Sequence, residues 1–369
     1  MGAVDPQFWN GRRVLVTGHT GFKGSWLALW LDRLGARVTG FALPPDTRDG
    51  VFGHCLDGRM ASVIGDVTDR DALARAVADA APEIVIHMAA QALVRPSYAD
   101  PVGTFATNVV GTVNLLQICR SAPDLRVLLV VTSDKVYENR EEGQPFREGD
   151  PLGGHDPYSA SKACAEIATA SFRRSYFTQG ARVAAVRAGN VIGGGDWSAD
   201  RIVPDLVRAL AQGEPVALRY PHSVRPWQHV LEPLSGYLAF AQALAMSRAD
   251  LPGALNFAPD ASSFRSVAGL AEAFAARYGA DTAWRKAEGT HPHEAGHLTL
   301  DAAEARRVLG WDPVLDFDAA VAWTADWYAA HARGGDMRAM TLDQIAAYMT
   351  RDTSGRRCSK RDNVELRGP

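Results

Sequence analysis

A glycine-rich turn between a short apolar run and a helical pattern constrains this chain more than any other feature. The apolar run RVLVT spans residues 13–17, and Gly18, Gly21 and Gly24 follow it directly in GHTGFKGSWLALWL. Glycine permits a tight turn and lets a phosphate come close to the backbone. The helix that follows offers free N–H groups and a positive dipole end. Between a strand and a helix, this spacing indicates a dinucleotide-binding unit rather than an ordinary turn.

Short apolar runs alternate with longer helical patterns along the rest of the chain. The runs are apolar throughout, which is typical of strands buried on both faces of a parallel sheet. We therefore expect a doubly wound, Rossmann-like α/β fold of about seven strands. The expected strands are 13–17, 37–42, 61–65, 83–88, 126–132, 182–188 and 254–258, and the expected helices are 22–34, 69–80, 101–121, 157–178 and 229–246.

Glycine and proline become frequent after about residue 190, as in GNVIGGGDW and YPHSVRPWQH. This change predicts a smaller, discontinuous C-terminal region that binds the substrate. The expected division gives a dinucleotide-binding domain over 1–189 and 228–258, a substrate region over 190–227 and 259–345, and a flexible tail over 346–369.

Composition excludes several classes of partner. The chain has 369 residues, 47% of them hydrophobic and 22% charged, with a net charge of -3, so neither nucleic acid nor an acidic membrane surface is expected to bind. We find no signal-peptide pattern and expect no transmembrane helix, so the cytoplasm is the expected location. The four cysteines form no CxxC pair and predict neither a zinc site nor a disulfide framework.

Two polar patterns predict chemistry. Tyr158 and Lys162 stand four apart at the start of an expected helix, so they share a face, and an ammonium beside a phenol favours the phenolate. The stretch TSDK (132–135) ends a buried strand at the edge where open α/β sheets bind ligands. Each pattern alone is also compatible with an exposed pair or a polar turn. Together with the glycine turn, they favour an active site.

These motifs resemble those of the extended short-chain dehydrogenase/reductase family. Within it, the chain is similar to the nucleotide-sugar 4,6-dehydratases, and more narrowly to the branch that acts on CDP-glucose. The similarity covers about residues 8–340, and the last stretch from about 350 lies outside it. The segments that carry it are FWNGRRVLVTGHTGFKGSWLALWL, TSDKVYEN, RAGNVIGGGDW, VRPWQHVLEPLSGY and HPHEA.

The resemblance implies oxidation of the sugar at C4 by NAD, loss of water across C5 and C6, and return of the hydride to C6. By motif, Tyr158 takes the proton of the C4 hydroxyl with Lys162 as its electrostatic partner, and Ser133 hydrogen-bonds near the C4 oxygen. Asp134 is the acid for C6. Lys135 replaces the glutamate of the dTDP-glucose relatives and matches the CDP-glucose branch, and its role as the C5 base is a hypothesis.

The same resemblance assigns the cofactor contacts. An acid often ends the second strand of an NAD site, but here that strand ends in GFALPP, with Asp46 and Arg48 only further on. NAD and NADP therefore remain open from the residues alone. Asp66 is an alternative adenosine contact or a helix cap. The expected cofactor-binding residues are Gly18, His19, Gly21, Phe22, Lys23, Gly24, Asp66, Val67, Ala89, Tyr158 and Lys162.

On the substrate side, the resemblance places Asn190, Arg201 and Arg225 at the diphosphate of CDP-glucose. The histidines of HPHEAGH (291–297) lack HExxH spacing, so we expect no metal there and a loop beside the nucleotide. The family also implies a homodimer, paired through a four-helix bundle of 101–121 and 157–178. Alternatives are a GDP-mannose or dTDP-glucose 4,6-dehydratase, a UDP-hexose 4-epimerase, or a non-catalytic dinucleotide sensor, which would be expected to lack Tyr158 or Lys162.

Overall fold

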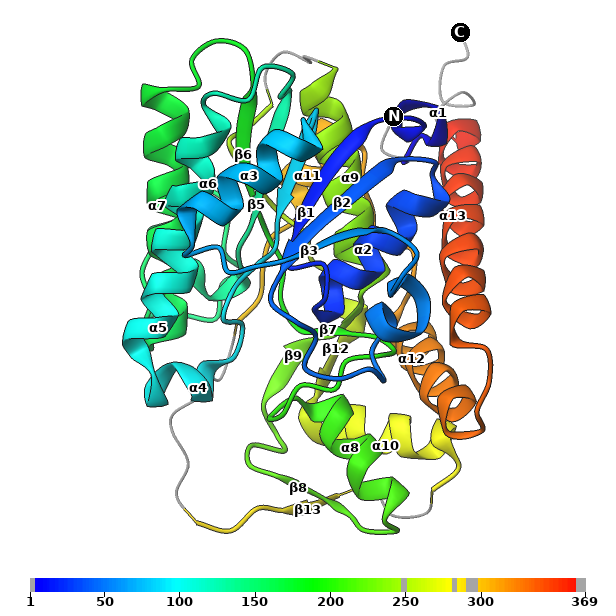
Figure 1. Cartoon of the computed structure of the whole chain (residues 1–369). Helices are drawn as coiled ribbons and strands as arrows, with labels where there is room; N and C mark the ends of the chain where they lie inside the picture. Colours follow the sequence, from blue (N-terminus) through cyan, green and yellow to red (C-terminus); the bar gives the residue numbers. More distant parts are fainter. Residues whose placement is uncertain (1–3, 247–250, 281–283, 290–297, 363–369) are drawn as a thin grey trace, which may run out of the picture.

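The computed structural model describes residues 4–246, 251–280, 284–289 and 298–362, and a parallel sheet forms the centre of this part of the chain (Figure 1). Seven strands form it in the order β11-β6-β5-β4-β1-β2-β3, which confirms the predicted fold class. The order reverses between β1 and β4, the switch point where such sheets bind ligands. The strands are β1 (Arg13–Thr17), β2 (Arg37–Ala42), β3 (Ala61–Ile64), β4 (Ile84–His87), β5 (Val127–Val131), β6 (Arg182–Arg187) and β11 (Ala254–Asn256).

Alternate side chains of the central strands enter two separate cores. Val14 and Val16 of β1 pack in the larger core, whereas Leu15 between them packs in the smaller one. Helices α2 (Phe22–Arg33) and α9 (Leu231–Ala245) contribute to the larger core. The smaller core is closed by α3 (Arg70–Ala80), α6 (Gly111–Cys119) and α7 (Pro157–Ser175). Apolar residues on both faces of each strand are what a three-layer fold requires.

The segment predicted as one helix over 101–121 consists of three pieces. Helix α5 (Pro101–Phe105) passes through a π-helical turn, η2 (Ala106–Val110), into α6. Asn108 in that turn is buried, and its amide nitrogen donates to Gln91 O at 3.0 Å and to Ser161 Oγ at 2.8 Å. The stretch Pro101–Cys119 is long and apolar enough to cross a membrane by length and composition, and 39% of its most apolar window is buried.

A smaller region lies beyond the carboxyl ends of the strands, at the bottom of Figure 1. It holds α8 (Ile202–Ala211), α10 (Val267–Tyr278) and short strand pairs. The pairs are β7 (Val191–Ile192) with β10 (Gln228–His229), β8 (Val216–Leu218) with β13 (Trp284–Lys286), and β9 (Val224–Pro226) with β12 (Phe264–Ser266).

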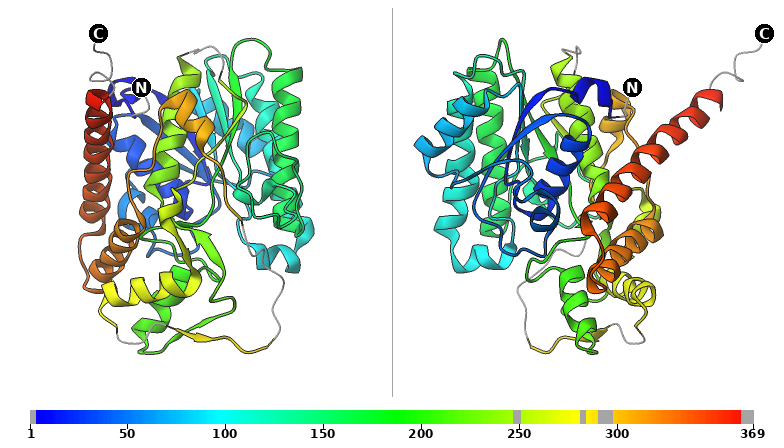
Figure 2. Two further views of the ribbon diagram at one scale, coloured as in Figure 1. Left: turned by 180° about the vertical axis from the view of Figure 1, so that it is seen from behind. Right: turned by 45° about the vertical axis from the view of Figure 1, so that its right-hand side comes forward.

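The C-terminal helices return to the first helix of the sheet. Helix α12 (Phe317–Ala332) leads into the long α13 (Met337–Asp362), whose course Figure 2 shows. Tyr348 of α13 is buried and meets Trp30 of α2 edge-on at 5.6 Å between ring centroids. Helical and packed chain therefore extends past residue 346, where the sequence suggested that a flexible tail begins.

Candidate active site

The glycine turn forms a cradle that only glycine can line. Gly18 has a φ of +76°, and a Cβ there would overlap the backbone of Met88 and Ala89 after β4. A Cβ on Gly24 would overlap the carbonyl of Gly18. Gly21 caps α2 without any side-chain hydrogen bond, so the first N–H groups of the helix keep their capacity for an anion. The turn therefore fits the diphosphate of a dinucleotide.

A cavity of about 1520 Å³ opens beside this turn, between the sheet and the smaller region. Pockets for a single ligand typically have about 300–1000 Å³, so this one has room for a dinucleotide and a second nucleotide. The sequence-predicted cofactor residues that line it are Gly18, Gly21, Phe22, Lys23, Gly24, Asp66, Val67, Ala89, Tyr158 and Lys162.

His19 is the exception among the predicted cofactor residues. Its ring is fully buried and packs on Gly40 of β2, with Nε2 2.7 Å from Ser62 Oγ. Burial lowers the pKa of His19 to about 4, so the ring is neutral. The side chain is absent from the cavity wall and carries no charge to offer a phosphate there, which corrects the expectation that it binds the cofactor.

Asp66 lines the cavity after β3 and does not cap the next helix. Its Oδ1 accepts a hydrogen bond from Thr68 N at 2.8 Å within the turn. The N-cap of α3 is Asp69, whose Oδ1 accepts from Asp71 N and Ala72 N, so the sequence-based alternative of Asp66 as a helix cap is wrong. Asp46 also lines the cavity, which leaves two acids on the side where a ribose is expected.

The polar stretch after β5 holds a buried carboxylate. Ser133 caps the short helix η3 (Asp134–Val136), and its Oγ lies 2.9 Å from Asp134 Oδ1 and accepts from Lys135 N at 3.2 Å. Asp134 is 3% exposed, and Asn190 Nδ2 donates to its second oxygen at 3.4 Å. A Cβ on Gly189 would overlap this carboxylate. Lys135 is half-buried and lines the same cavity.

Tyr158 and Lys162 lie together at the start of α7 and are both buried. Burial raises the pKa of Tyr158 to about 12, while a hydrogen bond with Ser133 and the charge of Arg201 act in the opposite direction. Lys162 Nζ donates to Val131 O at 3.2 Å, and burial lowers the pKa of Lys162 to about 8. The sequence predicted a lowered pKa for the phenol, but in the protein alone burial outweighs the nearby positive charge.

Lys23 reaches the catalytic side of the cavity. Its Nζ donates to the hydroxyl of Tyr237 on α9 at 3.3 Å. Burial, together with the charges of Arg201 and Lys162, lowers the pKa of Lys23 to about 7, while Asp134 opposes this. The sequence placed Lys23 among the cofactor-binding residues and did not predict its contact with Tyr237, because α9 is more than 200 residues away along the chain.

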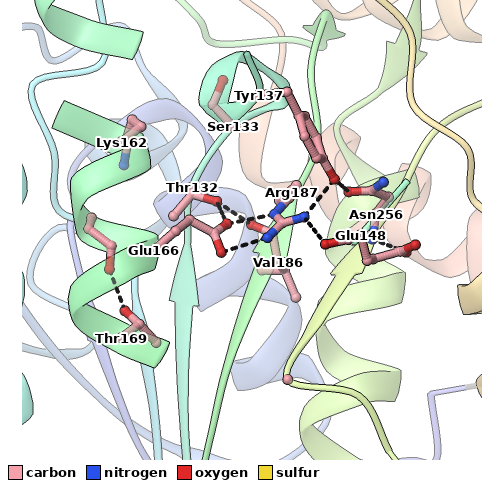
Figure 3. A network of polar contacts seen from close by, with 12 residues as sticks. Thr132, Ser133, Tyr137, Glu148, Lys162, Glu166, Thr169, Val186, Arg187 and Asn256 are labelled. Carbon is pink, nitrogen blue, oxygen red and sulfur yellow. Dashed lines mark hydrogen bonds and ion pairs between the residues drawn. The ribbon is translucent and has the colours of Figure 1, made fainter. Parts of the chain in front are cut away.

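A buried network lies behind the catalytic residues (Figure 3). Arg187 at the end of β6 donates to both carboxylate oxygens of Glu166 on α7, at 2.8 and 2.9 Å. Thr132 Oγ1 donates to Glu166 at 2.6 Å, and Arg187 Nη1 donates to the hydroxyl of Tyr137 at 2.6 Å. Glu166 follows Lys162 by one helical turn. From this spacing, the sequence could have predicted that Glu166 lies on the same face of α7 as the catalytic residues.

The network continues to the edge strand of the sheet. The hydroxyl of Tyr137 donates to Asn256 Oδ1 of β11 at 2.7 Å, and Glu148 Oε1 accepts from Asn256 N at 2.9 Å. The strand end that carries Ser133 and Asp134 is thereby joined to α7, β6 and β11 at once.

The three residues predicted to bind substrate all line the cavity. Arg201 Nη1 donates to Asp196 Oδ2 at 3.0 Å, an acid that sequence reasoning missed. Arg225 on β9 is buried, and Asn190 holds a left-handed φ of +52°. The histidines at 291, 293 and 297 lie outside the described residues.

Comparison with known proteins gives consistent matches. Residues 14–251 match the NAD dependent epimerase/dehydratase family. A CDP-glucose 4,6-dehydratase of Salmonella typhimurium is 44% identical over 357 residues, which are 95% of this chain and 99% of the relative. A dTDP-glucose 4,6-dehydratase of Xanthomonas campestris is 28% identical, covering 85% of this chain and 92% of the relative. The crystal structure of DesIV, a dTDP-glucose 4,6-dehydratase of Streptomyces venezuelae, was solved with NAD and TYD bound. DesIV is 26% identical to this chain, and the two structures superpose with a TM-score of 0.74. The match covers 87% of this chain and 98% of DesIV.

Proposed function

The chain belongs to the NAD-dependent epimerase/dehydratase family, and we propose that it converts CDP-D-glucose to CDP-4-dehydro-6-deoxy-D-glucose. The observation that carries this proposal is the near full-length match to a CDP-glucose 4,6-dehydratase. The buried Asp134 and the neighbouring Lys135 support it, because both face the cavity where an elimination needs an acid and a base.

NAD, when bound, supplies the oxidation at C4 and the later reduction at C6. Tyr158 accepts the proton of the C4 hydroxyl, and Ser133, which lines the same cavity, hydrogen-bonds near the C4 oxygen. The ketone at C4 acidifies the proton on C5, which Lys135 removes. Asp134 then protonates the C6 hydroxyl, and water leaves. The charge of Arg201 favours the phenolate that the first step requires.

The substrate diphosphate is proposed to lie between Arg201, Arg225 and Asn190. Guanidinium groups bind phosphate oxygens in pairs, and Asp196 holds Arg201 in place by an ion pair of 3.0 Å. This arrangement gives the cavity one wall from the proposed dinucleotide domain (1–189 and 228–258) and one from the proposed substrate region (190–227 and 259–345).

Two alternatives differ in what they require of these residues. A 4-epimerase has no elimination to catalyse and no use for an acid and a base at C5 and C6, whereas Asp134 and Lys135 both line the cavity here. A dinucleotide sensor has no use for the pair Tyr158 and Lys162, which is present and buried.

The first test is the choice of nucleotide. The purified protein, incubated with CDP-, dTDP-, GDP- or UDP-hexoses with and without added NAD, is expected to form the base-developed ultraviolet chromophore of a 4-keto-6-deoxy sugar with CDP-glucose. The kcat/KM for CDP-glucose should exceed that for the other three by at least about 100-fold, because a polar pocket built for one base rejects another strongly. Product from another nucleotide instead would correct the substrate, and silence with all four while NAD still binds would favour the sensor.

We further propose a homodimer in the cytoplasm. Helix α7 and the stretch α5–η2–α6 lie side by side at one edge of the molecule (Figure 1) and expose apolar side chains there, among them Val102 (79% exposed), Val110 and Ile167 (56% exposed). A second copy of the same face would cover them, as an isologous interface requires. The described cysteines, Cys55, Cys119 and Cys164, are free thiols, as is usual in a reducing compartment.

The dimer has a direct test. Light scattering at micromolar concentration is expected to give twice the chain mass for the wild type and the single chain mass for the variant Val102→Asp/Ile167→Asp, because two buried charges per copy would face each other. The matched control is Met246→Asp, an exposed apolar residue after α9 on another face, which should remain dimeric. A wild type with the mass of one chain would refute the proposal.

A further inference from the structure

Two imidazoles and one carboxylate converge outside the active-site cavity. Asp49 comes from the loop after β2, His54 from the π-helical turn η1 (Phe52–Leu56), and His331 from the last turn of α12. One carboxylate oxygen and one ring nitrogen of each histidine all lie within 4.8 Å of one another. Sequence spacing did not point to these residues, because the fold brings them together from two ends of the chain.

The surrounding aromatic residues fix the directions of the ring nitrogens. The His331 ring stacks on Trp327, with centroids 5.6 Å apart and planes at 8°. The His54 ring meets His331 at 5.2 Å and 76°. The indole nitrogen of Trp197 donates to the backbone oxygen of Asp49 at 2.8 Å, so the loop that carries the carboxylate is also held.

The ring nitrogens are available for a ligand. Among the described residues, the imidazoles of His54 and His331 make no hydrogen bond, and His331 Nε2 lies 4.0 Å from Asp49 Oδ1. A neutral imidazole is the form that binds a metal.

We propose that Asp49, His54 and His331 form a binding site for a divalent transition metal ion of the zinc class. Nitrogen and carboxylate ligands at about 2.0–2.2 Å in tetrahedral geometry stand about 3.3 Å apart, so the three ligand atoms need to close by about 1.5 Å at most. The exposed side chain of Asp49 provides its part of this movement by rotation, while Trp197 holds the backbone of the loop. Water completes the coordination. Imidazole ligands favour Zn²⁺, Ni²⁺ or Cu²⁺ over Mg²⁺ and Ca²⁺, which prefer oxygen.

The site would join the loop after β2 to the wall of the substrate cavity. Trp327, which stacks on His331, packs against Gly194, where a Cβ would overlap its ring. Tyr328, the next residue, donates from its hydroxyl to Asp196 O at 2.5 Å, and Asp196 holds Arg201. A bound ion would therefore stabilise the position of α12 against the loop that presents Arg201.

The test is Zn²⁺ titration of the full-length protein after removal of metal by a chelator, followed by calorimetry. We expect the wild type to bind Zn²⁺. Its affinity for Zn²⁺ is expected to fall at least tenfold in each of Asp49→Asn, His54→Ala and His331→Ala. Co²⁺ in place of Zn²⁺ should give the visible bands of a low-coordinate N/O site, and each variant should lose them. Asp49→Asn is the decisive variant, because it removes a charge from an exposed side chain and leaves the aromatic packing intact.

Two controls separate this site from other histidines. His222→Ala removes an exposed histidine elsewhere and should retain the wild-type affinity. A variant with alanine at positions 291, 293 and 297 should retain the Co²⁺ bands that Asp49→Asn loses. Zn²⁺ affinity weaker than about 0.1 mM in the wild type, or equal affinity in the wild type, Asp49→Asn and His54→Ala, would overturn the proposal.

Discussion

Replacing Tyr158 by phenylalanine is expected to lower kcat for CDP-glucose by about three orders of magnitude and to leave NAD affinity within about threefold. The substitution removes only the hydroxyl, which lies in the cavity wall and is proposed to accept the C4 proton. In a single turnover, no reduced cofactor should form at its characteristic absorbance. The matched control is Tyr176→Phe, an exposed tyrosine just after the same helix, which should keep wild-type turnover.

The variant Lys135→Ala should stop the same reaction one step later. Oxidation at C4 does not need the side chain of Lys135, so reduced cofactor should accumulate within one turnover while no water is lost. Exchange of the C5 proton with deuterated solvent, followed by NMR, should be abolished. Near-normal elimination or normal exchange in Lys135→Ala would show that another group is the base.

Replacing Glu166 by alanine is expected to reduce the free energy of unfolding by about 3–5 kcal/mol. The side chains of Glu166 and Arg187 are both 4% exposed and joined by two hydrogen bonds, so the variant leaves a buried guanidinium without its counter-charge. Denaturant unfolding followed by fluorescence, at fixed protein concentration and without NAD, measures the loss. Arg187 keeps its bond to Tyr137, which is neutral and does not balance the charge.

Two further variants distinguish loss of the charge pair from loss of packing. The double variant Glu166→Leu/Arg187→Met removes both charges at similar volume and should recover most of the lost stability. Asp124→Ala breaks the exposed pair with Arg13 and should cost at most about 1 kcal/mol. If Glu166→Ala were no worse than Asp124→Ala, the buried pair would contribute little to the fold.

The sheet could be predicted from the sequence because its signal is local. Strands such as β5 are continuous apolar runs, and the glycine turn indicates where β1 ends and where α2 begins. The π-helical turn η2 escaped prediction because it depends on Asn108, whose partners Gln91 and Ser161 lie elsewhere in the chain. The hydrophobic periodicity of a segment gives no information about such contacts with distant residues.

The glycine turn shows the same limit within one motif. His19 and Lys23 stand four residues apart, and the sequence placed both among the cofactor-binding residues. In the fold, Gly40 leaves room for the ring of His19, which enters the interior, whereas Lys23 meets Tyr237 across the cavity. The two side chains differ in the residues that pack against them. Those residues belong to strands and helices that are distant in the sequence.

The packing of α13 on α2 also has a consequence for how the protein is made. Helix α2 carries Trp26 and Trp30, but Tyr348, which contacts Trp30, is synthesised more than 300 residues later. Until then, part of the apolar face of α2 has no native partner. Since contacts distant in sequence slow folding and uncovered apolar surface attracts other chains, the nascent chain must pass through a long aggregation-prone interval before α2 is covered.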